Sequence, residues 1–216
     1  GQPLDLAPYE KELAAIKAEY GNRICALITE PYLGGGGSFH PQPEYMRLLE
    51  NFCRQNDIVF ILDEVQANFG RTGGMFAFDH YGVEPDIVVL GKGLGNGVPV
   101  AAAVGRADIM GSLGYGEGSD TYSGNPLACA AVLATLDEFA DADVMGHAAK
   151  LAEIIGQALT KMQKELPIVA HVRGEGVVWG IEFAGTNGHS ASEIANAAVE
   201  ACYHGDDEGH AIHLLG

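Results

Sequence analysis

The sequence has few basic residues and no long hydrophobic run. Lysine and arginine total 12 residues against 29 aspartates and glutamates, which gives a formal net charge of −17. A surface this acidic repels phosphate backbones, so we expect no nucleic-acid partner. No apolar stretch approaches the roughly 20 residues that a membrane-spanning helix needs, so we expect no membrane partner either.

Cysteine is also scarce, and no CxxC pair occurs. The four cysteines are Cys25, Cys53, Cys129 and Cys202. Their wide spacing is typical of reduced core residues in a cytoplasmic protein, rather than of a disulfide framework or a zinc site. The first ten residues lack the basic and apolar regions of a signal peptide, which also favours a cytoplasmic location.

Several common site motifs are missing as well. The stretch 91–97, "GKGLGNG", has neither the GxxxxGK[ST] spacing of a phosphate loop nor the GxGxxG spacing of a dinucleotide-binding turn. No GxSxG nucleophile elbow is present. Three histidines near the end of the chain match no strong zinc pattern, so we predict no metal site. They are His204, His210 and His213.

Helical and strand-like periods alternate along the chain. Helical spacing covers residues 8–19, 42–56, 126–139, 147–165 and 190–203. Apolar, β-rich runs cover residues 24–30, 58–64, 86–91, 100–105, 168–174 and 177–183. This order predicts an α/β domain over residues 1–145, with a mixed, mostly parallel sheet flanked by helices, and part of a small α+β domain over residues 146–216. The link from 86–91 to 100–105 is too short for a parallel crossover, so we expect an antiparallel neighbour there.

Two charged residues follow apolar strands, where open α/β sheets place their ligand sites. Asp63 ends the run "IVFIL", and Lys92 follows "IVVLG" among glycines. We expect Asp63 to be partly desolvated and to need a partner, with a helix cap or an ion pair to Arg71 as the structural alternative. We expect Glu64 to point the opposite way and to serve structure.

Lys92 is the stronger candidate for chemistry. An amine in apolar surroundings loses its proton more readily and becomes a nucleophile toward carbonyl groups. The flanking glycines would let a planar group approach closely. An ordinary exposed loop lysine is the alternative interpretation, and the residues leave both open.

The stretch "SDTYSGNP", residues 119–126, precedes a predicted helix. Helix N-termini attract anions, so the hydroxyl groups here are candidates for holding a phosphate. An N-cap made by Ser123 or Asn125 is the structural alternative. An amine, a carboxylate and a phosphate site together suit an aromatic aldehyde cofactor with a phosphate, which describes pyridoxal 5'-phosphate.

Two long stretches of the sequence resemble a known family. The stretch 62–106, "LDEVQANFGRTGGMFAFDHYGVEPDIVVLGKGLGNGVPVAAAVGR", and "TYSGNPLACAA" resemble the class III (ω-) aminotransferases of fold type I. Acetylornithine, ornithine and 4-aminobutyrate aminotransferases belong to this family. The similarity extends from about residue 24 to "VRGEGVVWGIEF" at 172–183, nearly the whole chain.

The resemblance implies roles for five residues. Lys92 resembles the lysine that forms a Schiff base with pyridoxal phosphate and moves the α-proton. Asp63 resembles the aspartate that pairs with the pyridinium nitrogen. By the same resemblance, Val65 would pack on the ring, and Gln66 would reach the phenolic oxygen. Thr121 resembles the threonine that contacts the phosphate of the neighbouring subunit's cofactor, which implies a homodimer.

The chain departs from the family pattern in two respects. Where relatives read EP-x-QGEGG, this chain has "EPYLGGGG", so Leu33 replaces the family glutamine and Gly35 the glutamate that switches a substrate-binding arginine. Pyruvate or another small acceptor then becomes comparable with 2-oxoglutarate. Family chains are also longer at both ends, so we expect a fragment holding at most half of a cofactor site.

Three functions remain open. The first is transfer of an amino group from an amine or amino acid, ω-amino substrates included, to a 2-oxo acid. The second is a pyridoxal phosphate-dependent decarboxylase or aminomutase on the same scaffold. The third is a non-catalytic remnant that keeps the fold and the dimer surface.

Overall fold

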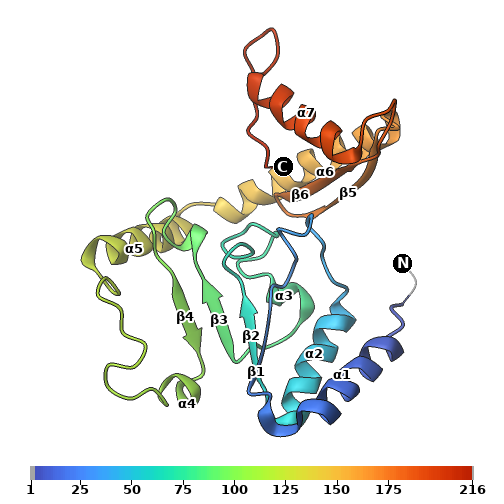
Figure 1. Ribbon diagram of the computed structural model, residues 1–216. Coiled ribbons are helices and arrows are strands. Elements are labelled where there is room, and N and C mark those ends of the chain that lie inside the picture. Colours follow the sequence, from blue (N-terminus) through green and yellow to red (C-terminus); the bar gives the residue numbers. More distant parts are fainter. Residues whose placement is uncertain (1–2, 216) are drawn as a thin grey trace.

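A four-stranded sheet organises the first two thirds of the chain in the computed structural model, which describes residues 3–215. Its strands lie in the order β1 (Ala26–Thr29), β2 (Val59–Asp63), β3 (Ile87–Leu90) and β4 (Ala102–Gly105). β1, β2 and β3 are parallel, whereas β4 pairs antiparallel with β3. The expected α/β class and the antiparallel neighbour are both confirmed. Figure 1 shows the twisted sheet with α1 and α2 beside β1.

One face of the sheet is packed and the other is open. Helices α1 (Ala7–Tyr20) and α2 (Pro43–Asn56) lie on the packed side, where α2 contacts β2. Along β2 the burial alternates, so that Phe60 and Leu62 are fully buried while Val59, Ile61 and Asp63 are partly exposed. Since successive side chains of a strand point to opposite faces, Asp63 lies on the face away from α2.

The packed face holds the largest hydrophobic core. It joins α2, β2 and the short helix α3 (Phe78–Tyr81). Its buried members are Met46, Leu49, Cys53, Ile58, Phe60, Leu62, Tyr81 and Val83. Burial of this apolar area anchors β2, because transfer from water contributes about 25 cal/mol per Å². The strand end that carries Asp63 is therefore fixed from behind.

The rest of the chain forms a helical arm and a second, smaller sheet. Helix α5 (Pro126–Asp141) leads into α6 (Val144–Glu165), and an antiparallel hairpin of β5 (Val169–Glu175) and β6 (Val178–Phe183) follows. Helix α7 (Ala191–His204) packs on β6. Figure 1 shows α6, the hairpin and α7 above the carboxyl ends of the parallel strands.

Two details differ from the sequence expectations. Helix α6 begins at Val144 rather than 147, because the side chain of Asp143 accepts a hydrogen bond from the N–H of Gly146 and caps an earlier turn. All four cysteines are free, but only Cys53 is buried, and Cys25 and Cys129 are exposed. The prediction of core cysteines is wrong for those two, because Cys25 precedes β1 and Cys129 lies on an outward face of α5.

Candidate active site

The ends of β2 and β3 bring Asp63 and the loop of Lys92 to the same edge of the sheet. Asp63 is directly opposite Val89 in the ladder, and the N–H of Glu64 donates to the carbonyl of Val89 at 3.0 Å. Asp63 Oδ1 accepts a hydrogen bond from the N–H of Val65 at 3.0 Å, which fixes the turn that follows the strand. Among the described residues, no ion pair joins Asp63 to Arg71.

The amine of Lys92 meets the side chain of Gln66. Lys92 Nζ donates to Gln66 Oε1 at 3.1 Å, across two loops 26 residues apart in sequence. Lys92 is exposed in this chain, so the expected burial of its side chain is not found. The reason is that this turn packs through the buried side chain of Leu94, whereas the glycines beside Lys92 have no side chains to cover the amine.

The Lys92 backbone is held in an unusual conformation. Its φ angle is +45°, a region that non-glycine residues rarely adopt and that costs on the order of 1 kcal/mol or more. The buried side chain of Asn68 donates to the carbonyl of Gly91 at 3.2 Å and supports this turn from the β2 side. Strain that is fixed by neighbouring contacts is common at functional sites.

The glycines on either side of Lys92 allow its turn to pack closely against another loop, in addition to the role expected from the sequence. A Cβ on Gly91 would lie 3.2 Å from Val65 Cγ1, and one on Gly93 would lie 3.1 Å from Asn68 Oδ1. Both glycines therefore let the Lys92 turn lie against the loop after β2. The sequence interpretation was that these glycines leave open space for a planar group. The space beside Gly91 and Gly93 is instead occupied by the side chains of Val65 and Asn68.

Glu64 is structural, as its position predicts. It is fully buried, and its two carboxylate oxygens accept hydrogen bonds from the N–H groups of Ala77 and Phe78 at 2.9 and 2.8 Å. Burial raises the pKa of Glu64, and the two N–H groups partly oppose that shift. This carboxylate holds the segment before α3 against the end of β2.

Sequence reasoning missed two residues near Gln66. Tyr32 is 1% exposed and belongs to a buried cluster with Ala77 and with Ala67, the residue that follows Gln66. A Cβ on Gly34 would lie 2.7 Å from Gln66 Oε1, so the amide of Gln66 rests against the glycine loop. The available sequence signal was an aromatic residue, Tyr32, two positions before a run of glycines. Only the fold shows which side chains lie beside that run.

Thr121 lies apart from the other candidate residues. It belongs to the segment 111–125 between α4 (Ala107–Met110) and α5, and it is exposed. Figure 1 shows this segment standing away from the sheet. Asn125 caps α5, because its side-chain oxygen accepts from the N–H of Ala128 at 2.9 Å. The capping alternative is therefore confirmed for Asn125, and the structure does not bring Thr121 to Lys92.

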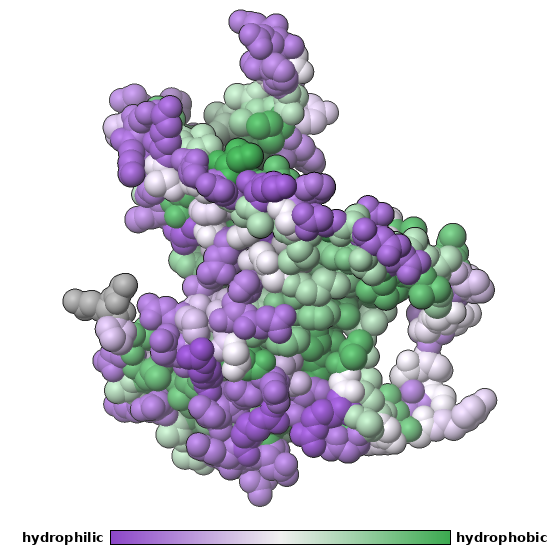
Figure 2. Space-filling view, turned by 180° about the vertical axis from the view of Figure 1, so that it is seen from behind, coloured by the Kyte–Doolittle hydropathy of each residue, from purple (hydrophilic) through white to green (hydrophobic). Residues whose placement is uncertain are grey.

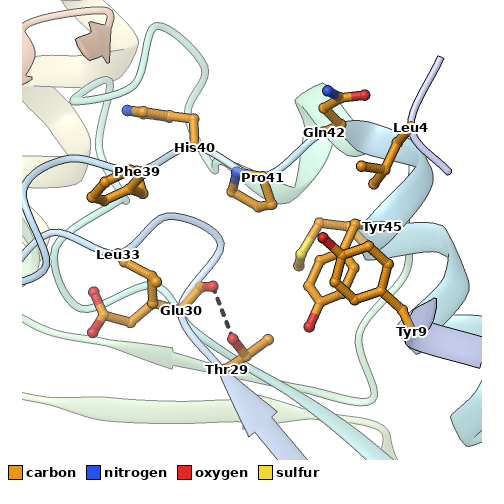
Figure 3. A pocket seen from close by; sticks show the side chains of 11 residues that line it. Leu4, Tyr9, Thr29, Glu30, Leu33, Phe39, His40, Pro41, Gln42 and Tyr45 are labelled. Atoms are coloured by element: carbon orange, nitrogen blue, oxygen red, sulfur yellow. Dashed lines mark hydrogen bonds between the residues drawn. The ribbon is translucent and has the colours of Figure 1, made fainter. Parts of the chain in front are cut away.

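A separate cavity of about 360 Å³ opens beside the end of β1. The loop from Leu33 to Gln42 and the helices α1 and α2 enclose it, and Tyr9 and Tyr45 form its aromatic wall. Figure 3 shows the side chain of Gln42 turned outward and the carboxylate of Glu30 turned away from the two tyrosines. This cavity lies apart from the Lys92–Gln66 contact.

Two further properties concern only the described part of the chain. Over residues 3–215, no group of three or more histidine, cysteine, aspartate or glutamate side chains could hold a metal ion. Within the same range no helix has both the length and the apolar character that crossing a membrane requires.

Known proteins with this arrangement are enzymes of fold type I. Residues 5–216 match the family described as Aminotransferase class-III. Acetylornithine aminotransferase from Caldanaerobacter subterraneus subsp. tengcongensis is 38% identical over 189 residues, which cover 88% of this chain and 47% of that protein. Leucine/methionine racemase from Thermococcus litoralis is 38% identical over 163 residues, which cover 76% of this chain and 37% of that protein.

A solved structure agrees with the sequence matches. Acetylornithine aminotransferase from Elizabethkingia anophelis superposes with a TM-score of 0.80 at 30% identity, covering 98% of this chain and 53% of that chain. The chain therefore belongs to the class-III aminotransferase family, whose members have fold type I and use pyridoxal phosphate. It spans about half the length of the curated relatives that it matches.

Proposed function

We propose that this chain carries part of the active site of a pyridoxal phosphate-dependent aminotransferase, with Lys92 as the residue that binds the cofactor aldehyde. The contact between Lys92 Nζ and Gln66 Oε1 at 3.1 Å carries the proposal, because it joins two of the assigned residues across separate loops. The substrates are an amine or amino acid donor and a 2-oxo acid acceptor.

The residues present fit this cofactor. Lys92 offers an exposed amine to an aldehyde, and Asp63 offers a partly exposed carboxylate on the open face of the sheet. Gly34 leaves space that the amide of Gln66 fills, so a donor and acceptor group is already placed beside the amine. Val65 lies between Asp63 and Gln66 in sequence and is partly exposed, so it is available to contact a ring.

When bound, pyridoxal phosphate withdraws electrons from the α-carbon of the substrate. Asp63 would keep the ring nitrogen protonated, because a carboxylate favours the charged form of a nearby base. Val65 would pack against the ring, and Gln66 would orient the phenolic oxygen. The amine of Lys92 would remove the α-proton of the substrate and return it, as general base and acid.

The proposed assembly is a homodimer in which Thr121 reaches the phosphate group of the neighbouring subunit's cofactor. Its support is the exposure of the whole segment 111–123, including Tyr115 and Tyr122 at 108% and 78% exposed. Large apolar residues of α5 are exposed as well. They are Leu127, Leu133 and Leu136. Figure 2 shows hydrophobic residues gathered over the middle of the molecule and over α5.

The acceptor preference follows from the glycine loop. Position 35 carries no carboxylate, and a Cβ built there would meet nothing within 4 Å. We therefore propose that pyruvate and other small 2-oxo acids are accepted alongside 2-oxoglutarate. Amino-donor assays with each acceptor test this proposal, and activity with 2-oxoglutarate alone would contradict it.

The main test is covalent labelling of the protein with pyridoxal phosphate. We expect a visible absorbance band, an adduct that borohydride makes permanent, and a modified peptide containing Lys92. Lys92→Ala should abolish the labelled peptide and lower turnover of the full protein by at least about a thousandfold. Lys150→Ala, which removes an exposed lysine from α6, is the matched control and should label normally. A protein that never labels at Lys92 would favour a non-catalytic remnant.

A second candidate function is racemisation of an amino acid. The observation that favours it is the racemase from Thermococcus litoralis, which matches this chain at the same 38% identity as the first aminotransferase. Decarboxylation and aminomutation also remain compatible with Lys92 and Asp63. Chiral analysis of a single amino acid incubated without any acceptor separates racemisation from transamination. Without an acceptor, a transaminase stops after it has converted one donor molecule per active site.

A further inference from the structure

We propose that Asn68 is a positioning residue whose buried side-chain amide holds the turn that carries Lys92, so that the amine of Lys92 stays directed at Gln66. The catalytic meaning of this arrangement rests on the proposed function, whereas the arrangement itself can be tested without the cofactor.

Asn68 has a fixed place in the loop after β2. It is 0% exposed, its N–H donates to the carbonyl of Glu64 at 3.0 Å, and its carbonyl accepts from the N–H of Arg71 at 3.4 Å. Glu64 is itself buried, and its carboxylate is held by two backbone N–H groups of the segment before α3. The side chain of Asn68 therefore extends from a well-anchored backbone.

The carbonyl of Gly91 joins Asn68 to the Lys92 turn. This oxygen accepts from Nδ2 of Asn68 at 3.2 Å and from the N–H of Leu94 at 3.0 Å. A carbonyl oxygen has two lone pairs, so it can hold both donors at once. Since the bond from Leu94 closes the 3₁₀ turn η2 (Lys92–Leu94), Asn68 holds the carbonyl group on which that turn is built.

The two ends of the Asn68 amide have unequal surroundings. The carbonyl of Gly91 only accepts, so the nitrogen must face it. The oxygen Oδ1 is buried and has no hydrogen-bond partner among the described residues, and a Cβ on Gly93 would lie 3.1 Å from it. An unpaired buried acceptor is unfavourable, so the amide adds little net stability to the fold. Its clear structural effect is the bond to Gly91.

The backbone of the turn decides where the amine of Lys92 lies. The side chain is exposed, so no surrounding side chains enclose it. Its direction depends on the backbone, whose φ angle of +45° lies in a region that non-glycine residues readily leave. In this conformation Nζ lies 3.1 Å from Oε1 of Gln66. Without Asn68 the turn is free to relax, and a misplacement of about 1 Å can slow a reaction about a hundredfold.

The test compares Asn68→Ala with Thr72→Val. Thr72 is 3% exposed, and its hydroxyl donates to the carbonyl of Ala67 at 3.4 Å, so this control removes a buried hydrogen bond from the same loop without touching Gly91. We expect Asn68→Ala to raise amide hydrogen exchange at residues 94–96 about two- to tenfold, as for loss of one hydrogen bond. The ¹H–¹⁵N resonances of the Gln66 side chain should also move. Thr72→Val should change neither.

The second measurement is the distribution of label in the full protein after treatment with pyridoxal phosphate and borohydride. The label at Lys92 relative to the exposed Lys150 should fall about two- to tenfold in Asn68→Ala and stay unchanged in Thr72→Val. Unmoved Gln66 resonances, an unchanged label ratio, or faster exchange spread evenly over the chain would overturn the inference. Moved resonances together with a wild-type protein that never labels at Lys92 would support the arrangement and reject the proposed function.

A third variant separates the N–H group from the space that it fills. Asn68→Leu keeps the number of side-chain atoms and removes the donor, and it carries the test if Asn68→Ala does not fold. Exchange at residues 94–96 should rise and the label at Lys92 should fall, as in Asn68→Ala. Wild-type exchange in Asn68→Leu would show that filled space alone holds the turn, which would overturn the inference.

Discussion

At the scale of single residues, neighbouring glycines in one loop have different roles. A side chain on Gly34 would collide with the amide of Gln66, whereas one on Gly35 would meet nothing within 4 Å. Neither glycine has a positive φ angle, so the difference between them is steric and not conformational. The loop "GGGG" is therefore not simply flexible, because its first glycine makes room for a site residue.

The contrast gives a paired prediction. Gly34→Ala should lower the free energy of unfolding by about 1–3 kcal/mol, because a methyl group is forced into a filled space. Gly35→Ala should change it by less than about 0.5 kcal/mol. Urea unfolding followed by circular dichroism measures both. Equal effects of the two substitutions would show that Gln66 does not occupy the space beside Gly34.

At the scale of elements, Asp86 joins two parts of the large sheet and helix α2. Its Oδ2 accepts from the N–H of Phe60 in β2 at 2.8 Å. Its Oδ1 pairs with Arg106, after β4, at 2.9 Å and with Arg54 of α2 at 3.3 Å. Burial alone would raise the pKa of Asp86, but the N–H of Phe60 and the two guanidinium groups bring it below its ordinary value.

Removal of this carboxylate should therefore weaken the sheet. We expect Asp86→Ala to lower the free energy of unfolding by about 2–4 kcal/mol, because a buried N–H group loses its acceptor and two guanidinium groups each lose one of their partners. Asp108→Ala is the control, since Asp108 pairs with Arg106 in an exposed position and should contribute less than about 1 kcal/mol.

The pH dependence has a definite sign. A lowered folded-state pKa means that the contribution of Asp86 is fully present above 3.8 and is lost as the pH falls through the lower folded value. Denaturant unfolding measured from pH 7 to pH 2 should show this loss in the wild type and a reduced loss in Asp86→Ala. Identical slopes in the two proteins would contradict the assignment.

At the scale of the whole molecule, the β5–β6 hairpin attaches to the large sheet through the loops near the candidate site. The N–H of Val177 donates to the carbonyl of Arg71 at 2.9 Å. Arg173 donates to the carbonyl of Gly37 at 3.2 Å and lies over the ring of Phe39 at 4.2 Å. The loop that holds Gly34 is therefore fixed from the hairpin side as well.

A contact between His40 and Glu175 completes this attachment and leads to a further prediction. His40 Nδ1 lies 3.4 Å from Glu175 Oε2, and this contact lowers the pKa of Glu175 against the effect of burial. Its contribution should be present above pH 4.5 and lost as the pH falls through the lower folded value. Glu175→Gln should raise amide hydrogen exchange at residues 37–40 about two- to fivefold at neutral pH, because a half-exposed pair contributes little.

Two comparisons decide that prediction. Glu165→Gln removes an exposed carboxylate that pairs with Lys161 at 3.9 Å, and exchange at residues 37–40 should not change in it. Compared at the same pH, the wild type and Glu175→Gln should exchange at equal rates once the pH is below the lowered folded pKa of Glu175. A faster exchange that is spread evenly over the chain would indicate general destabilisation instead.

The sequence by itself determined the order of the elements, the antiparallel position of β4 and the placement of Asp63 and Lys92 at strand ends. These features follow from hydrophobic period, link length and turn residues, which are properties of neighbouring positions. The division at residues 145 and 146 stays a prediction. The same holds for the site roles of all five residues, which are Asp63, Val65, Gln66, Lys92 and Thr121. The structural function of Glu64 was also predictable, because alternate side chains of a strand point to opposite faces.

Only the tertiary structure decided what surrounds the amine. Gln66 faces Lys92 because β2 and β3 pair in one register, and Gly34 lies beside Gln66 because β1 pairs with β2. The exposure of Lys92 was hidden for the same reason, since burial depends on which segments far apart in the sequence form the walls. Contacts of this kind depend on how strands and loops are packed together, and no local pattern encodes them.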